Sequence, residues 1–354
     1  MAETPLTLQQ MTNVIDRKGG DIPRVPLFWH KFYNAGTAEK YGQELIDFGA
    51  TIVDDCLDLR YVPPGDFEAF EGADPEYKWA VQEMPEDYAE RGITSRRPVD
   101  SVELIDELIE RMPDPSPERY YESAAETVKA NPDRYGVGWD FFCLFERAWF
   151  LFGMEEIMCE MLLNPERMER LLRGFTEYHK TVIDGFAEAG AHGYFTSDDL
   201  GSQAELLFSG ASFRELYLPF YEELVDHCHS RGMHFWLHSC GAIDEILPDI
   251  ASIGVDVIHP IQQGAMDQAA VADEYRGRIT FLAGIDVQEL LPQGTVAEVE
   301  AGTRAMIDSF DSEFGGCIAS CGNGIMPETP MENIKTWLRT AEEYGQRKRQ
   351  RHRG

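Results

Sequence analysis

The chain has 354 residues, 43% of them hydrophobic and 11% aromatic, which is the composition of a folded globular protein. Its formal net charge of −32 argues against nucleic acid as a ligand, because binding to phosphates depends on Lys and Arg. The longest apolar stretches are far shorter than the roughly 20 residues that cross a bilayer, and the N-terminus shows no secretory signal. We therefore expect a cytoplasmic protein that binds neither nucleic acid nor membrane. Its seven cysteines are an odd number without an export signal, which favours reduced thiols over disulfides.

Short apolar runs rich in β-branched and aromatic residues recur along the chain, and each is a candidate buried strand. Segments with apolar residues at helical spacing lie between most of them. Alternating strands and helices imply a parallel sheet, and eight repeats without a dinucleotide or P-loop fingerprint favour closure into a (β/α)8 TIM barrel. We predict one α/β domain over residues 1–354. The eight runs are 24–28, 51–55, 136–139, 193–198, 233–239, 255–260, 279–284 and 317–321.

Two segments do not fit the repeat. The interval from about 63 to 134 is acidic and dotted with proline, so we interpret it as an insertion or lid rather than barrel wall. The basic C-terminal sequence RKRQRHRG is most simply a solvated tail that follows a helix.

The run HFWLHSCG, residues 234–241, ends in a histidine and a cysteine two positions apart. Side chains at i and i+2 of a strand share a face, so His238 and Cys240 would both point to the active end of a barrel, where Gly241 permits a sharp turn. A catalytic zinc site takes three protein ligands, and Cys321, at the end of the last run, would complete the set. Cys317 lies four residues earlier and belongs to the far end. The alternative is that these are ordinary buried residues.

Carboxylates also gather at the predicted strand ends. Asp54 and Asp55 close the second run, Asp198 and Asp199 close the fourth, and Glu146 follows the third among aromatic residues. Each could be a zinc ligand, a partner of a ligand or a proton donor, and Glu146 could be an acid with a raised pKa. Helix N-capping is the alternative for the aspartates, and a surface pair with Arg147 is the alternative for Glu146.

Aromatic residues close the first run and could form a wall for a flat apolar ligand, although core packing explains them equally well. His30 could form a hydrogen bond to such a ligand. His227, His234 and His259 are interpreted as structural. The predicted substrate-binding residues are Trp29, His30, Tyr33 and Asp54.

Three stretches, HSCGAIDEILPDIASIGVDVIHPIQ, GRITFLAGIDV and CGNGIMPETPMENIKTW, resemble signatures of the uroporphyrinogen decarboxylase superfamily, and the resemblance covers nearly the whole chain. It implies a (β/α)8 barrel. The decarboxylases of that superfamily carry an N-terminal arginine-rich motif that holds substrate carboxylates, whereas the matching stretch here is RVPLFWHKFYNAG. The sequence is therefore more similar to the other branch, the zinc-dependent corrinoid methyltransferases.

That branch implies zinc held by His238, Cys240 and Cys321, with the corrinoid cofactor supplied by a separate carrier protein. Its last cysteine usually follows Pro-Gly, but Ser-Cys-Gly-Asn-Gly stands here, so Asn323 is an alternative alignment and a carboxylate would then complete the metal site. The sequence leaves the oligomeric state open.

The favoured reaction is O-demethylation of a methoxylated aromatic, because the end of the first run is aromatic and not basic. Methyl transfer from a methylcobamide to a thiol coenzyme is the alternative, and a sulfonated thiol would require Arg or Lys nearby. Two further hypotheses are a metal-independent decarboxylase of a polycarboxylate and a non-catalytic barrel that serves as a binding scaffold.

Overall fold

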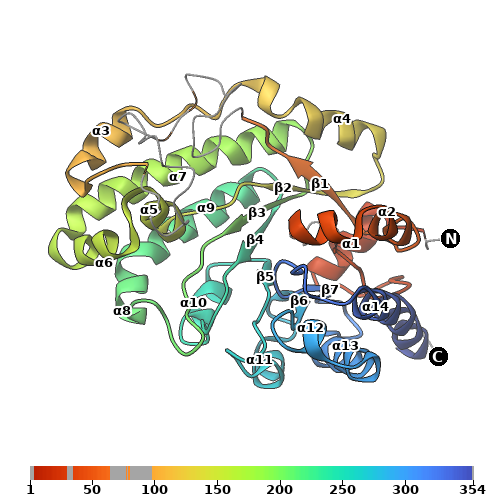
Figure 1. Cartoon of the computed structure of the whole chain (residues 1–354). Helices are drawn as coiled ribbons and strands as arrows, with labels where there is room; N and C mark the ends of the chain where they lie inside the picture. The colour runs from red at the N-terminus through yellow and green to blue at the C-terminus, as the bar shows by residue number, and fades with distance from the viewer. Residues whose placement is uncertain (1–3, 30–34, 64–76, 78, 80–97, 353–354) are drawn as a thin grey trace.

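The computed structural model describes residues 4–29, 35–63, 77, 79 and 98–352. A single curled sheet of parallel strands, paired in chain order from β1 to β7, occupies the centre, and helices surround it (Figure 1). The fold is the predicted TIM-barrel type. The strands are β1 (Cys56–Arg60), β2 (Tyr135–Trp139), β3 (Gly193–Ser197), β4 (His234–His238), β5 (Val257–His259), β6 (Thr280–Ile285) and β7 (Cys317–Cys321).

The helices alternate with these strands and bury one face against them. The long α7, for example, begins with Pro165 in its first turn and lines its inner face with residues such as Leu172 and Phe175. The helices are α1 (Leu8–Ile15), α2 (Ala35–Gly49), α3 (Ile105–Glu110), α4 (Glu122–Ala130), α5 (Phe145–Phe152), α6 (Met154–Leu163), α7 (Pro165–Glu188), α8 (Gly210–Ser212), α9 (Leu218–Ser230), α10 (Leu247–Ser252), α11 (Gln268–Tyr275), α12 (Leu290–Gln293), α13 (Val296–Phe310) and α14 (Met331–His352).

The barrel closes through the segment 24–28, the first predicted strand. Leu27 forms a parallel bridge with Ala319 of β7, and the Asp55 amide donates to the Leu27 carbonyl at 2.8 Å on the other side. The segment therefore lies between β7 and β1, where an eighth strand belongs. The second predicted strand was wrong in its bounds: β1 spans 56–60, and residues 51–55 form the turn that leads into it.

The closure is fixed by a buried ion pair. Arg24 and Asp55 are 1% and 0% exposed, and Arg24 Nη1 lies 2.6 Å from Asp55 Oδ2 while Nη2 lies 2.7 Å from Oδ1. The same carboxylate accepts the amides of Leu6 and Leu27 at 2.7 and 2.8 Å. Four donors thus satisfy one carboxylate and tie the N-terminal segment to the start of β1.

The alternation of side chains along the strands separates an inner from an outer face. Phe28 contacts Trp236 of β4 at 6.3 Å between ring centroids, although several strands separate them along the sheet, so both rings lie inside the barrel. Phe281 of β6 instead packs on Phe310 of α13 at 4.6 Å and lies outside. Since residues in register on parallel strands share a face, these two contacts fix the orientation of the remaining strand residues.

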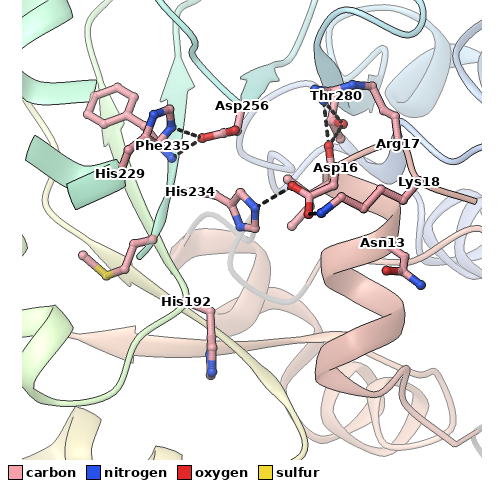
Figure 2. Close-up of polar contacts among 12 residues, drawn as sticks. Asn13, Asp16, Arg17, Lys18, His192, His229, His234, Phe235, Asp256 and Thr280 are labelled. Atoms are coloured by element: carbon pink, nitrogen blue, oxygen red, sulfur yellow. Dashed lines mark hydrogen bonds and ion pairs between the residues drawn. The ribbon is translucent and has the colours of Figure 1, made fainter. Parts of the chain in front are cut away.

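Polar residues fill the N-terminal end of the barrel, where α1 packs. Figure 2 shows His234 of β4 pointing to Asp16, which follows α1, with Nε2 and Oδ1 3.0 Å apart. Nδ1 of His234 lies 2.7 Å from the Tyr135 hydroxyl, and nearby His229 meets Asp256. These contacts agree with the structural role expected for His234.

The described part of the interval 63–134 contains α3, which packs on α7, and α4, which packs on β1. Its function as a lid stays a prediction. The prediction that the basic C-terminus is a solvated tail was wrong. The helix α14 continues to His352, and Arg349 is buried in an ion pair with Asp311. Among the described helices, none combines the length and the apolar character of a membrane span.

We predict that Asp55→Asn lowers the free energy of unfolding by about 3–5 kcal/mol, because it leaves the Arg24 charge buried without its partner. Urea denaturation followed by circular dichroism measures the change. Asp106→Asn, which removes a surface pair with Arg170, is the matched control and should leave stability nearly unchanged. Equal stability of Asp55→Asn and the control would contradict the assigned role of this pair.

Candidate metal centre

Three potential metal ligands meet at the C-terminal ends of β3 and β4. One ligand atom from each of Asp199, His238 and Cys240 lies within 4.8 Å of the others. Nε2 of His238 is 3.2 Å from Cys240 Sγ and 3.4 Å from Asp199 Oδ1. The predicted neighbourhood of His238 and Cys240 is therefore present, and Asp199 is their third partner.

Two glycines allow the loops after β3 and β4 to approach closely. Gly241 has φ of 82°, and a Cβ there would lie 2.3 Å from the Gly201 carbonyl group. The Ala242 amide donates to the Ser202 carbonyl at 2.8 Å. The Cys240 amide donates to Asp199 Oδ1 at 2.9 Å. The close approach of the two loops therefore holds the Cys240 thiol and the Asp199 carboxylate together.

The loop that carries Cys240 is also fixed from β5. Gln262, which follows that strand, accepts the Gly241 amide at 2.8 Å through Oε1. Gln262 was not among the residues predicted from the sequence; its position just past a strand end was the available signal.

A second histidine supports His238. Nδ1 of His259 lies 2.6 Å from Nδ1 of His238, and Nε2 of His259 lies 2.8 Å from the Cys321 carbonyl oxygen. Burial, and then the neighbouring charge of His238, lower the pKa of His259 well below its ordinary value, so its ring is neutral. Burial also acts to lower the pKa of His238, but the charges of Cys240 and Asp199 outweigh it and the net shift is well upward.

The donor set fits zinc. A thiolate, an imidazole and a carboxylate are the three ligand types that Zn²⁺ binds in proteins, and three protein ligands leave a position for substrate in a catalytic site. The thiolate makes Mg²⁺ or Ca²⁺ a poor match, since those ions take oxygen ligands.

Cys321, the third ligand expected from the sequence, is not part of this group. Cys321 is in register with Ile285, and Cys317 with Phe281, whose ring packs outside the barrel on α13. Both cysteines therefore face the helices, and the predicted inward orientation of Cys321 was wrong. Cys321 contributes its carbonyl group to the site through His259 and keeps its thiol buried elsewhere.

Asn323, the alternative to Cys321, lies at the site but as a donor. Its Nδ2 is 3.1 Å from Cys240 Sγ. An amide N–H directed at sulfur stabilises the thiolate form, which is the form that binds metal.

Glu146, at the start of α5, is buried beside the three ligands. Ser197 accepts the Phe142 amide at 3.0 Å and donates its hydroxyl proton to Glu146 Oε2 at 2.7 Å. Burial, with the charges of Asp199 and Asp198, raises the pKa of Glu146 to about 8. The carboxyl group is thus protonated at neutral pH, and no surface pair with Arg147 is formed.

Asp198 caps a helix. Its carboxylate accepts the backbone amides of Leu144, Phe145 and Glu146 at 3.0, 3.0 and 2.5 Å. It also accepts the hydroxyl of Tyr221. Burial raises the pKa of Asp198 to about 6 despite these donors. Asp198 is not the N-cap residue of α5, which is Leu144, but its carboxylate binds the first amides of that helix from the end of β3 and so fixes the first turn of α5 and with it Glu146.

The predicted substrate wall is different in the structure. Trp29 packs against Gly49 of α2, and its Nε1 donates to the Val53 carbonyl at 2.9 Å, so the indole lies on the outer side. Asp54 accepts the Trp29 backbone amide at 3.3 Å. Its contact with the predicted substrate wall is therefore a hydrogen bond to the backbone of that segment. His30 and Tyr33 lie outside the described residues.

Other aromatic rings fill the barrel below the site. Trp139 and Phe195 are 4.3 Å apart, and Phe195 contacts His259 at 6.1 Å between ring centroids. Phe141, 40% exposed, continues this cluster to the surface through Trp139 at 5.1 Å. Phe141 was not among the residues predicted from the sequence, although it follows a strand end.

The chain belongs to the uroporphyrinogen decarboxylase (URO-D) family, whose model matches residues 88–344. Methylcobamide:CoM methyltransferase MtaA of Methanosarcina barkeri is 24% identical over 194 residues, which are 55% of this chain and 54% of that protein. The chain thus matches about half the length of this curated relative. A solved methyltransferase from Methanosarcina mazei aligns over 96% of this chain and 99% of its own, with a TM-score of 0.62 and 18% identity, which shows a shared fold.

We predict that the protein binds about one equivalent of Zn²⁺ and that Asp199→Ala, His238→Ala and Cys240→Ala each weaken this binding strongly. Cys321→Ser and Cys317→Ser are the matched controls and should retain the metal. Elemental analysis after dialysis against a zinc buffer measures the content. Loss of zinc in Cys321→Ser would contradict the assigned face of β7.

Proposed function

We propose that this protein is a zinc-dependent methyltransferase that moves a methyl group between a small methylated compound and a corrinoid protein. The favoured direction is O-demethylation of a methoxylated aromatic. The observation that carries the proposal is the group formed by Asp199, His238 and Cys240 at the C-terminal end of a URO-D family barrel. The activity in the name of the Methanosarcina barkeri relative supports it.

The three ligands would hold the metal where the barrel strands end. A bound Zn²⁺ supplies a Lewis acid, which makes an ether oxygen a better leaving group or a thiol a better nucleophile. The protein supplies the rest: Asn323 donates to the Cys240 sulfur, and His259 orients His238.

Glu146 is the proposed proton donor. Oε2 already accepts the Ser197 hydroxyl, so the carboxyl proton resides on Oε1. Burial is the first cause of the raised pKa and persists when the charge of Asp199 is neutralised. When a methoxy group loses its methyl as a cation equivalent, the oxygen left behind is a phenolate, and a carboxyl group in this position delivers the proton that converts it to a phenol.

The exposed ring of Phe141 supports an aromatic substrate. It extends the buried cluster of Trp139 and Phe195 to the surface, and a flat methoxylated ring would stack or pack edgewise on it. Thiol methylation remains the second candidate, because the name of the Methanosarcina barkeri relative specifies that reaction.

The corrinoid would come from a separate carrier protein, as the branch resemblance implies. A corrinoid supplies the organometallic chemistry of methyl transfer. The part of this chain is to bind the small substrate, hold it against the three ligands and supply the proton.

We predict that the zinc-loaded protein demethylates methoxyarenes with cob(I)alamin as acceptor, followed by the absorbance of methylcob(III)alamin. Glu146→Gln, which keeps the shape but cannot donate the proton, should lower kcat about 10²- to 10⁴-fold with zinc content unchanged. Cys317→Ser is the control with full activity. Methylation of thiols alone would reverse the substrate preference, and carbon dioxide release without metal would favour the decarboxylase hypothesis instead.

We predict that Phe141→Ala raises KM for a methoxyarene about 3- to 10-fold and leaves kcat nearly unchanged, since the ring contributes binding and no chemistry. Leu162→Ala, at an exposed apolar residue of α6, is the control. An unchanged KM in Phe141→Ala would remove this ring from the substrate site.

A further inference from the structure

We infer that His259 is a positioning residue for the metal site. By accepting a hydrogen bond from Nδ1–H of His238, it directs Nε2 of His238, the atom that would bind the metal, to Asp199 and Cys240. This inference rests on the proposed metal site, and it goes beyond it by assigning the atom of His238 that binds and the group that selects this atom.

The hydrogen bonds of His259 determine where its proton lies. Nε2 is 2.8 Å from the Cys321 carbonyl oxygen, which can only accept, so Nε2 carries the proton. The ring is fully buried and carries one proton when neutral, which leaves Nδ1 as an acceptor.

The short contact between the two rings then fixes His238. The two Nδ1 atoms are 2.6 Å apart, and one proton must lie between them. Since Nδ1 of His259 is the acceptor, the proton belongs to His238. Nε2 is therefore the nitrogen of His238 that can give up its proton and offer a lone pair to a metal, and it lies 3.2 Å from Cys240 Sγ.

The barrel holds both rings in this arrangement. His238 and His259 are in register on β4 and β5 and share the inner face. Their centroids are 4.8 Å apart, and Phe195 packs against the edge of His259 at 6.1 Å. The Ser239 amide also donates to the His259 carbonyl at 2.9 Å, which secures the backbone on both strands. Rotation of His238 that exchanged its nitrogens would break the bond to His259.

Cys321 contributes to the metal site through its backbone carbonyl group. The carbonyl oxygen of Cys321 holds His259, His259 holds His238, and the thiol takes no part. A carbonyl is retained in every substitution at 321, so Cys321→Ser should leave the chain of contacts intact.

The first test compares His259→Phe with His259→Asn. Phenylalanine keeps the ring but has no acceptor, whereas asparagine offers Oδ1 at the position of Nδ1. We expect zinc affinity, measured by competition with a chromophoric chelator, to fall about 10- to 100-fold in His259→Phe and to stay within about 3-fold of wild type in His259→Asn. Equal loss in both variants, with both folded by circular dichroism, would overturn the inference, as would full affinity in His259→Phe.

The second test needs no metal. Histidine-selective ¹⁵N NMR of the metal-free wild type should show a proton on Nδ1 of His238 in a strong hydrogen bond, and this signal should shift in His259→Asn. An unprotonated Nδ1 of His238 overturns the inference even if zinc binds. A protonated, hydrogen-bonded Nδ1 in a protein that binds no zinc upholds the positioning and refutes the proposed metal function, so the two failures are distinguishable.

Discussion

The register of the parallel strands is the constraint on which the site depends. Because side chains alternate between the two faces, and because partners in register share a face, the orientation of one strand determines that of the next. Ser197, His238 and His259 are in register at the ends of β3, β4 and β5, and all three point inward. The same rule carried across β6 turns Cys321 toward the helices. If the register of β7 on β6 differed by one residue, the Cys321 side chain would point into the barrel, and Cys321 would contribute its thiol to the site instead of its carbonyl group.

The groups around the ligands are held by contacts that also stabilise the fold. The carboxylate of Asp198 fixes the first turn of α5 and so holds Glu146 next to Asp199. The close approach of Gly201 and Gly241 brings two loops into direct backbone contact and pairs Asp199 with the Cys240 amide. Few of these groups can move independently, which is the preorganisation that acid catalysis and metal binding require.

The sequence predicts the barrel because strand and helix patterns alternate clearly, and it predicts the pairing of His238 with Cys240 because residues two apart share a face. It fails for Cys321, since β7 is buried on both faces and its composition does not reveal which side chains point inward. Trp29 was misplaced for the same reason. The roles of Gln262, Phe141 and His259 depend on contacts between segments distant in the chain. Their positions at or just past strand ends mark them as candidates, but no local pattern specifies the contacts themselves. Asp198 binds the first amides of α5 from the end of another strand, a contact that the capping alternative did not foresee.

In the proposed site, one sulfur, one imidazole nitrogen and one carboxylate oxygen converge on a single metal. Zinc K-edge X-ray absorption of the wild-type protein counts these ligands directly. We expect one Zn–S distance of about 2.3 Å, with the other neighbours being nitrogen or oxygen at about 2.0–2.2 Å. Two sulfur ligands would contradict it, because a second thiolate could reach the metal only if β7 had a different register.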